Sequence, residues 1–173
     1  YPLEGQNNRL WRNYYNARLA HMELREADAE MLYKQISENA AASDRLRAYA
    51  LGDWGAILER SRRIFESGGR EKAVSALKSA LQILPDVDRK KVSMLQSLCG
   101  VYARLQERNL AEAYAIQAFD LAKKQTNVYE MVLTYDRMKS LYYMTGDWKS
   151  LLGVDSKAEE LLAGFAQSPP FLV

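Results

Sequence analysis

The chain has 173 residues, of which 48% are hydrophobic and 27% are charged, and this balance argues against an intrinsically disordered protein. With 24 basic and 22 acidic side chains, the net charge of +2 is too small to attract a phosphate backbone or an anionic membrane, so either partner would need a local patch. No apolar run in the sequence approaches the roughly 18 residues of a membrane span.

The opening segment, about residues 6–38, has apolar residues at helical spacing and no internal Gly or Pro. It forms either one long helix or a hairpin whose turn the sequence does not mark. The segment lacks the repeated spacing found later in the chain. We therefore expect residues 1–40 to cap the following helices, because they would cover an open apolar face.

The remaining residues favour helices, since long stretches are rich in Ala, Leu, Glu, Lys, Arg and Gln and lack the alternation of a strand. Turn signals separate these stretches. The signals are Asn39 to Ser43, Gly52-Asp53, Gly68-Gly69, Pro85-Asp86, Glu107 to Asn109, Asn127, Gly146-Asp147 and Ser168-Pro169-Pro170. We expect seven or more antiparallel helices, stacked in sequence order, with turns at Gly52, Gly68, about Arg108, Asn127 and Gly146.

A repeated spacing runs through the second half of the chain. The similar stretches SALQIL, QAFDLA and KAEELL place alanines at positions 80, 118 and 158, which are almost evenly spaced. The separation between Gly68 and Gly146 is twice this spacing. The sequence therefore predicts helix pairs that repeat about every 39 residues.

Two stretches share the triplet Gly-Asp-Trp, YALGDWGAIL from position 49 and YYMTGDWKSLL from position 142. The separation between Gly52 and Gly146 fits no whole number of periods, so we interpret them as turns at different points of the repeat. At each turn we expect the glycine to end one helix in a left-handed conformation, the aspartate to cap the next, and the tryptophan to lie buried between them. Trp148→Ala would then cost about 3 to 5 kcal/mol.

The stretch IFESGGREKAVSALKSALQILP, residues 64–85, resembles one unit of the tetratricopeptide repeat family. Phe65 closes a first helix, Gly68 turns, and Pro85 ends the unit. The last unit is similar at its aromatic, leucine, tyrosine, turn and alanine positions, which are Tyr135, Met138, Tyr142, Gly146 and Ala158. Departures from the family pattern are Ser61, Lys139, Leu151, Asp155 and a middle unit that is out of register at its turn.

The resemblance implies an all-α fold in which antiparallel helix hairpins stack into a short right-handed superhelix. The array would span residues 41–165, with units at 54–85, 90–124 and 128–163, followed by a tail at 166–173. In this family the first helix of each unit lines a concave groove. The resemblance therefore assigns partner binding to Leu58, Arg62, Phe65, Gln96, Arg104, Asp136, Ser140 and Tyr143.

Co-chaperone members of the family clamp a C-terminal carboxylate with Lys and Asn on adjacent first helices. The corresponding positions in this chain hold Leu58, Arg62 and Gln96. The resemblance therefore does not favour a receptor for chaperone tails.

The single cysteine and the single histidine do not form a catalytic pattern. Cys99 lies where the repeat needs a small residue, and His21 lies beside the apolar stripe at Met22, so packing is preferred over a reactive role for each. Acid pairs such as Glu159-Glu160 are typical of a solvated helix face. Zinc, calcium and phosphate-loop spacings are missing from the sequence. We therefore expect no enzyme, no metal site and no cofactor.

The basic stretch ERSRRIF, residues 59–65, has three interpretations. Its arginines could form ion pairs along one helix, bind carboxylates of a partner, or bind nucleic acid. The adjacent pairs Tyr14-Tyr15 and Tyr142-Tyr143 are also suggestive, because neighbouring side chains diverge on a helix and one of each pair must be exposed or line a groove.

Two classes of function follow from the sequence. The first is a non-catalytic protein-interaction module that binds a peptide or helical segment of a partner, alone or as the repeat portion of a larger chain or complex. The second is a sensory repeat domain of a signalling protein or transcription regulator, whose output domain lies outside this chain. Neither nucleic-acid binding nor membrane insertion is expected. The sequence does not decide the compartment, although it favours the cytoplasm.

Overall fold

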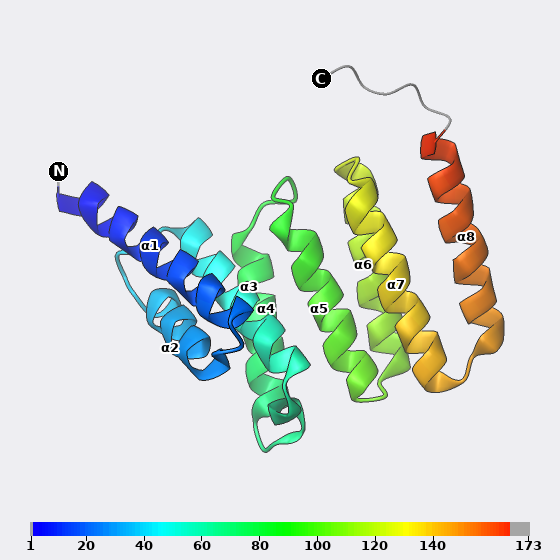
Figure 1. Ribbon diagram of the computed structural model, residues 1–173, viewed down its shortest axis with the longest axis horizontal. Coiled ribbons are helices and arrows are strands. Elements are labelled where there is room, and N and C mark those ends of the chain that lie inside the picture. Colours follow the sequence, from blue (N-terminus) through cyan, green and yellow to red (C-terminus); the bar gives the residue numbers. More distant parts are fainter. Residues whose placement is uncertain (1, 167–173) are drawn as a thin grey trace.

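The computed structural model describes residues 2–166, and these form eight α-helices and no strand (Figure 1). The helices are α1 (Pro2–Met22), α2 (Glu26–Ser37), α3 (Asp44–Arg60), α4 (Gly69–Ile83), α5 (Lys90–Arg104), α6 (Arg108–Lys124), α7 (Val128–Thr145) and α8 (Trp148–Ala166), with a 3-10 helix, η1 (Arg62–Phe65), after α3. The all-α prediction is confirmed for this part of the chain. The predicted turn at residues 168–170 lies outside it, as does the predicted tail apart from Ala166.

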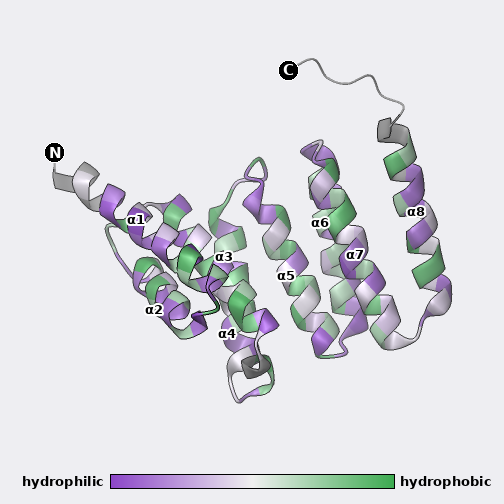
Figure 2. Ribbon diagram, viewed as in Figure 1, coloured by the Kyte–Doolittle hydropathy of each residue, from purple (hydrophilic) through white to green (hydrophobic). Residues whose placement is uncertain are grey.

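The helices follow one another across the molecule from α1 to α8, with consecutive helices running in roughly opposite directions (Figure 1). Each helix packs against the next one in sequence, and α5 also packs against α3 and α7. Figure 2 shows polar and apolar residues on every helix, as expected for helices that bury one face. No helix in the described range is long and apolar enough to cross a membrane.

The core is divided between three clusters of buried side chains. One joins α1, α2 and α3, the largest extends from α3 to α8, and a smaller one lies between α5, α6 and α7. Tyr49 and Trp54 pack against both of the first two clusters. Buried alanines, including Ala73, Ala80 and Ala118, keep the helix surfaces flat enough for close packing.

Most predicted turns are confirmed. Gly68 and Gly146 have left-handed φ values of 77° and 69°, and the side chain of Asn127 accepts a hydrogen bond from the Glu130 backbone N–H at 3.3 Å. A turn also precedes Arg108, where α6 begins. The structure shows that the opening segment is a hairpin. Its turn contains Leu24 at φ 61°, a residue type that gives no turn signal in the sequence.

The predicted turn at Gly52 is wrong, because Gly52 lies inside α3 and is buried. A Cβ atom there would overlap the side chain of Met94 on α5. One turn further along α3, a Cβ at Gly55 would lie 2.6 Å from Leu77 Cγ on α4. These glycines therefore allow close contact between helices, whereas the sequence analysis interpreted the first as a helix end.

The second Gly-Asp-Trp triplet does form a turn, but its tryptophan is not where we expected it. Asp147 Oδ1 accepts a hydrogen bond from the Ser150 backbone N–H at 3.0 Å, which confirms the cap. Trp148 is 58% exposed and packs only edge-on against Tyr143, with 5.7 Å between ring centroids. A ring with this exposure buries too little area for the large stability loss expected of Trp148→Ala.

Substitution of Gly55 measures the close contact between α3 and α4. We expect Gly55→Ala to lower the free energy of unfolding, since overpacking costs about 1 to 3 kcal/mol and exceeds the roughly 0.5 to 1 kcal/mol that Ala gains in a helix. Gly153→Ala is the matched control, because a Cβ at this helical position meets no atom within 4 Å and should stabilise the protein. Urea unfolding of both variants makes the comparison. Equal stabilisation by the two alanines would contradict close packing at Gly55.

Candidate functional site

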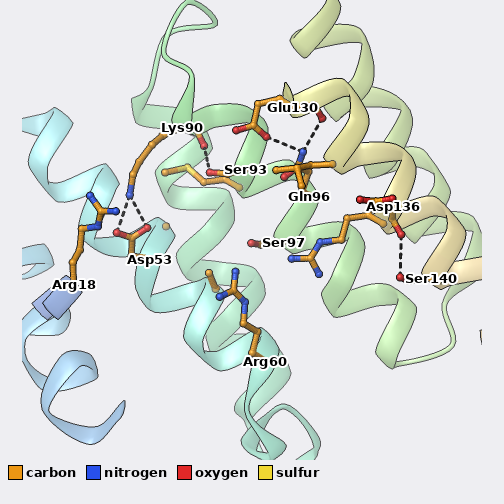
Figure 3. Close-up of a pocket in the computed structure, with 15 residues that line it drawn as sticks. Arg18, Asp53, Arg60, Lys90, Ser93, Gln96, Ser97, Glu130, Asp136 and Ser140 are labelled. Atoms are coloured by element: carbon orange, nitrogen blue, oxygen red, sulfur yellow. Dashed lines mark hydrogen bonds and ion pairs between the residues drawn. The ribbon is translucent and has the colours of Figure 1, made fainter. Parts of the chain in front are cut away.

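A hollow of about 590 Å³ lies on the side of the molecule formed by the odd-numbered helices α1, α3, α5 and α7 (Figure 3). Most of its side chains are polar. They are Arg18 from α1; Asp53, Ala56 and Arg60, with Gly52, from α3; Lys90, Ser93, Met94, Gln96 and Ser97 from α5; and Glu130, Leu133, Asp136, Arg137 and Ser140 from α7. We refer to this set as the hollow.

One end of the hollow is closed by an ion pair between α3 and α5. Lys90 Nζ lies 2.6 Å from Asp53 Oδ1 (Figure 3). It also donates at 2.6 Å to the hydroxyl of Tyr14, which itself donates to Asp53 Oδ2 at 2.6 Å. The ammonium group also lies over the rings of Tyr14 and Tyr49, 5.2 and 4.9 Å from their centroids. Burial lowers the pKa of Lys90, although Asp53 opposes this. The ammonium, carboxylate and hydroxyl groups thus serve as one another's hydrogen-bond partners, and they join the opening hairpin to the following helices.

The middle of the hollow contains a neutral amide that connects α5 to α7. Gln96 is buried, and its Nε2 lies 2.9 Å from Glu130 Oε2 (Figure 3). The same nitrogen lies 3.0 Å from Thr134 Oγ1. Burial raises the pKa of Glu130, and the hydrogen bond from Gln96 opposes the rise. The amide therefore fixes the position of one acidic wall residue.

A buried carboxylate lies beneath the other end. Glu59 is 3% exposed, and its oxygens lie 3.5 Å from Arg137 Nη1 and 3.8 Å from Arg60 Nε. Burial raises the pKa of Glu59, while the charges of Arg137, Arg60 and Arg104 lower it. Gly100 makes room for the group, because a Cβ there would lie 2.5 Å from Glu59 Oε1.

The hollow carries both signs of charge. Its basic residues are Arg18, Arg60, Lys90 and Arg137, and its acidic residues are Asp53, Glu130 and Asp136. Such a surface suits a partner with mixed polarity rather than a uniformly charged one.

The structure brings together only part of the predicted groove. Gln96, Asp136 and Ser140 line the hollow, and the last two are exposed. Arg104 donates from Nη1 to the backbone oxygens of Glu59 and Arg60 at 2.9 and 3.0 Å, so it supports the hollow from the end of α3.

The other predicted groove residues lie elsewhere. Leu58 is 1% exposed and belongs to the core, so it cannot contact a partner as we expected. Phe65 is exposed and packs under the guanidinium of Arg104, 5.5 Å from its ring centroid, and Tyr143 is exposed beside Trp148. Arg62 belongs to η1, and its side chain lies outside the described part of the structure.

The sequence analysis missed Asp53, Lys90 and Arg137 as wall residues. Asp53 was assigned to a turn, and Lys90 is one of several lysines near helix ends. For Arg137 the available signal was its position beside Asp136, which had been assigned to the groove. All residues on the face of α7 that carries Asp136, namely 133, 136, 137 and 140, could have been assigned to the groove together.

The cysteine and the histidine remain outside the hollow. Cys99 is buried, and burial raises the pKa of its thiol to about 11, which opposes thiolate formation. His21 is half-buried near the end of α1. Within the described range, no three His, Cys, Asp or Glu residues are grouped as metal ligands would be.

No family model, no curated protein and no solved structure matches the chain. Its function is therefore argued from the composition and geometry of the hollow.

The Tyr14 hydroxyl tests the network at the closed end. We expect Tyr14→Phe to lower the free energy of unfolding by about 1 to 2 kcal/mol, because Asp53 and Lys90 each lose a buried hydrogen-bond partner. The neighbouring Tyr15 is 58% exposed, so Tyr15→Phe should change stability by less than about 0.5 kcal/mol. Thermal and urea unfolding give both values. Similar losses in the two variants would contradict a specific role for the Tyr14 hydroxyl.

The pH dependence of stability tests the burial of Glu59. Since its folded-state pKa lies above the usual 4.5, Glu59 contributes most stability below that pH and loses this contribution as the pH rises through the folded-state value. We therefore expect Glu59→Gln, which cannot ionise, to gain stability relative to the wild type between pH 4.5 and neutral pH. Urea unfolding across this range measures the difference, with Glu160→Gln at an exposed site as the control. If the free energy of unfolding of the wild type rises relative to that of Glu59→Gln as the pH rises, the raised pKa of Glu59 is contradicted.

Proposed function

We propose that this chain is a non-catalytic protein-interaction module that binds a peptide or helical segment of a partner in the hollow. The observation that supports this most directly is that four successive odd-numbered helices contribute polar side chains to one continuous surface. A ligand that spans these helices must be extended along the row. Extended or helical segments have this shape, and polar walls offer both donors and acceptors to their side chains.

We further propose that the helix pairs form tetratricopeptide-like repeats in a right-handed superhelix. Polar contacts between residues of helices and turns support this, because several join residues separated by the period found in the sequence. Tyr49 and Asp88 are 39 residues apart, as are Arg108 and Asp147. The same separation of 39 joins Tyr14 to Asp53. We therefore infer that residues 1–40 are the first unit of the array, whereas the sequence led us to expect a cap that is not itself a repeat.

The size of the hollow supports a second candidate, a sensory repeat domain of a larger regulator. Small-molecule sites have volumes of about 300 to 1,000 Å³, and about 590 Å³ falls within this range. Gly52 and Met94, which hold α3 against α5, both line the hollow. A bound small ligand would therefore contact the place where the packing of these helices can change.

Site-specific photocrosslinking distinguishes the hollow from the rest of the surface. A photoreactive phenylalanine analogue replaces exposed Ser140 in the hollow or exposed Gln82 on α4, and each protein is irradiated in an extract of its native cells. We expect a discrete protein adduct from position 140 that is missing at position 82. Equal adducts at the two positions, or an adduct only at position 82, would contradict binding in the hollow. Modification by a small molecule alone would favour the sensory domain.

A further inference from the structure

Building on the proposed function, we propose that the segment bound in the hollow presents an acidic side chain, whose carboxylate the guanidinium groups of Arg60 and Arg137 bind above the buried Glu59. The partner is therefore a polypeptide with an Asp or Glu at the position that faces these two arginines.

The two arginines come from helices that are distant in sequence but meet at one carboxylate. Arg60 on α3 lies near Glu59 Oε2, and Arg137 on α7 lies near Oε1, at the 3.8 and 3.5 Å given above. Their side chains remain 57% and 33% exposed, and both line the hollow. Glu59 thus holds two guanidinium groups together beside a space that a ligand can enter.

The arginines retain donors for a ligand. Both distances to Glu59 exceed those of good N–H···O hydrogen bonds, so this carboxylate does not use the guanidinium groups at their best geometry. Arg104, in contrast, is occupied by the backbone oxygens at the end of α3. Each of the two guanidinium groups can offer a pair of parallel N–H groups to a carboxylate, which is the geometry of its strongest hydrogen bonds.

The local charge also favours an added carboxylate. One carboxylate between two guanidinium groups leaves an excess of one positive charge, and Glu59 Oε2 has no hydrogen-bond donor within the described residues. Two of the acidic wall residues are already engaged, Asp53 by Lys90 and Glu130 by Gln96. The Arg60–Arg137 pair is therefore a part of the hollow where two guanidinium groups together can receive an added negative group.

The same walls argue against a phosphate backbone. Nucleic acid presents a row of negative charges, whereas the hollow carries three acidic residues, Asp53, Glu130 and Asp136, among its four basic ones. A single acidic side chain needs only one basic pair. The hollow continues past the pair, towards Arg18 on α1 and Ser140 on α7, so a bound chain passes it and places a side chain there rather than a terminus.

The first experiment selects ligands from a phage library of short random peptides displayed without a free C-terminus, using the full chain as bait. We expect enriched peptides to share an acidic position. Each enriched peptide is then synthesised with Glu or Asp at that position, with the matching amide residue, and with a free or amidated C-terminus. Replacing the acid by its amide should weaken binding to the wild-type protein about tenfold or more, whereas amidating the C-terminus should have little effect. This comparison uses the unaltered protein and does not depend on the folding of any variant.

The second experiment changes the protein. Arg60→Gln should weaken binding of the acidic peptide about tenfold and leave binding of the amide peptide almost unchanged. The substitution in the protein and the acid-to-amide change in the peptide remove the same contact. Arg12→Gln on the exposed surface of α1 is the charge-matched control. Removal of Arg137 alone would leave the buried carboxylate of Glu59 without this positive partner. The double variant Glu59→Gln/Arg137→Gln is therefore used, and its unfolding curve is measured alongside. Arg60→Lys should recover only part of the binding, since Lys keeps the charge and loses the paired donors.

Each outcome separates the two proposals. If no peptide is enriched, or if enriched peptides bind equally well to variants altered at Ser140 and Ser97 in the hollow, the proposed function itself is contradicted. If peptides bind in the hollow but tolerate the amide and the Arg60→Gln change, the carboxylate assignment is overturned and the interaction function survives. Dependence on a free C-terminus would also overturn it, in favour of a terminal carboxylate.

Discussion

The fold depends on how closely neighbouring helices can approach, because a single helix pair cannot bury its own apolar face. Along α3, one glycine meets Met94 on α5 and another meets Leu77 on α4. Gly100 on α5 provides the corresponding space for Glu59 and Arg137. The odd-numbered helices are thus held close enough for their exposed faces to form one continuous surface, and the hollow exists as a consequence of that packing.

Two charged groups in the hollow have different physical roles. Lys90, Asp53 and Tyr14 satisfy one another at short distances, so their network stabilises the contact between the opening hairpin, α3 and α5. Glu59 is buried with two arginines at longer distances and with one oxygen that has no hydrogen-bond donor among the described residues. Burial opposes the charge of Glu59, so this cluster is expected to contribute less to folding than the network at Lys90.

Sequence patterns predicted the turns wherever a special residue was needed. Gly68 and Gly146 adopt left-handed backbone conformations, and Asn127 caps a helix with its side chain. The turn at Leu24 was not predictable, because a leucine with positive φ is held there by surrounding structure rather than by its own preference. Trp148 was expected to be buried from its residue type, but at the turn between α7 and α8 its ring is exposed. Of the hollow, the sequence identified residues 96, 136 and 140 on the correct faces.

The sequence by itself determined the helical content and most helix ends, because these follow from local backbone preferences and from the spacing of small and apolar residues. The tertiary structure decided whether each glycine ends a helix or lies in a helix contact, since Gly52 and Gly146 occur in the same triplet, yet Gly52 lies inside α3 against Met94 and Gly146 ends α7 with a left-handed φ of 69°. It also decided which charges meet. Glu59 and Arg137 are distant in the chain, and only the packing of α5 between α3 and α7 brings their side chains to one site.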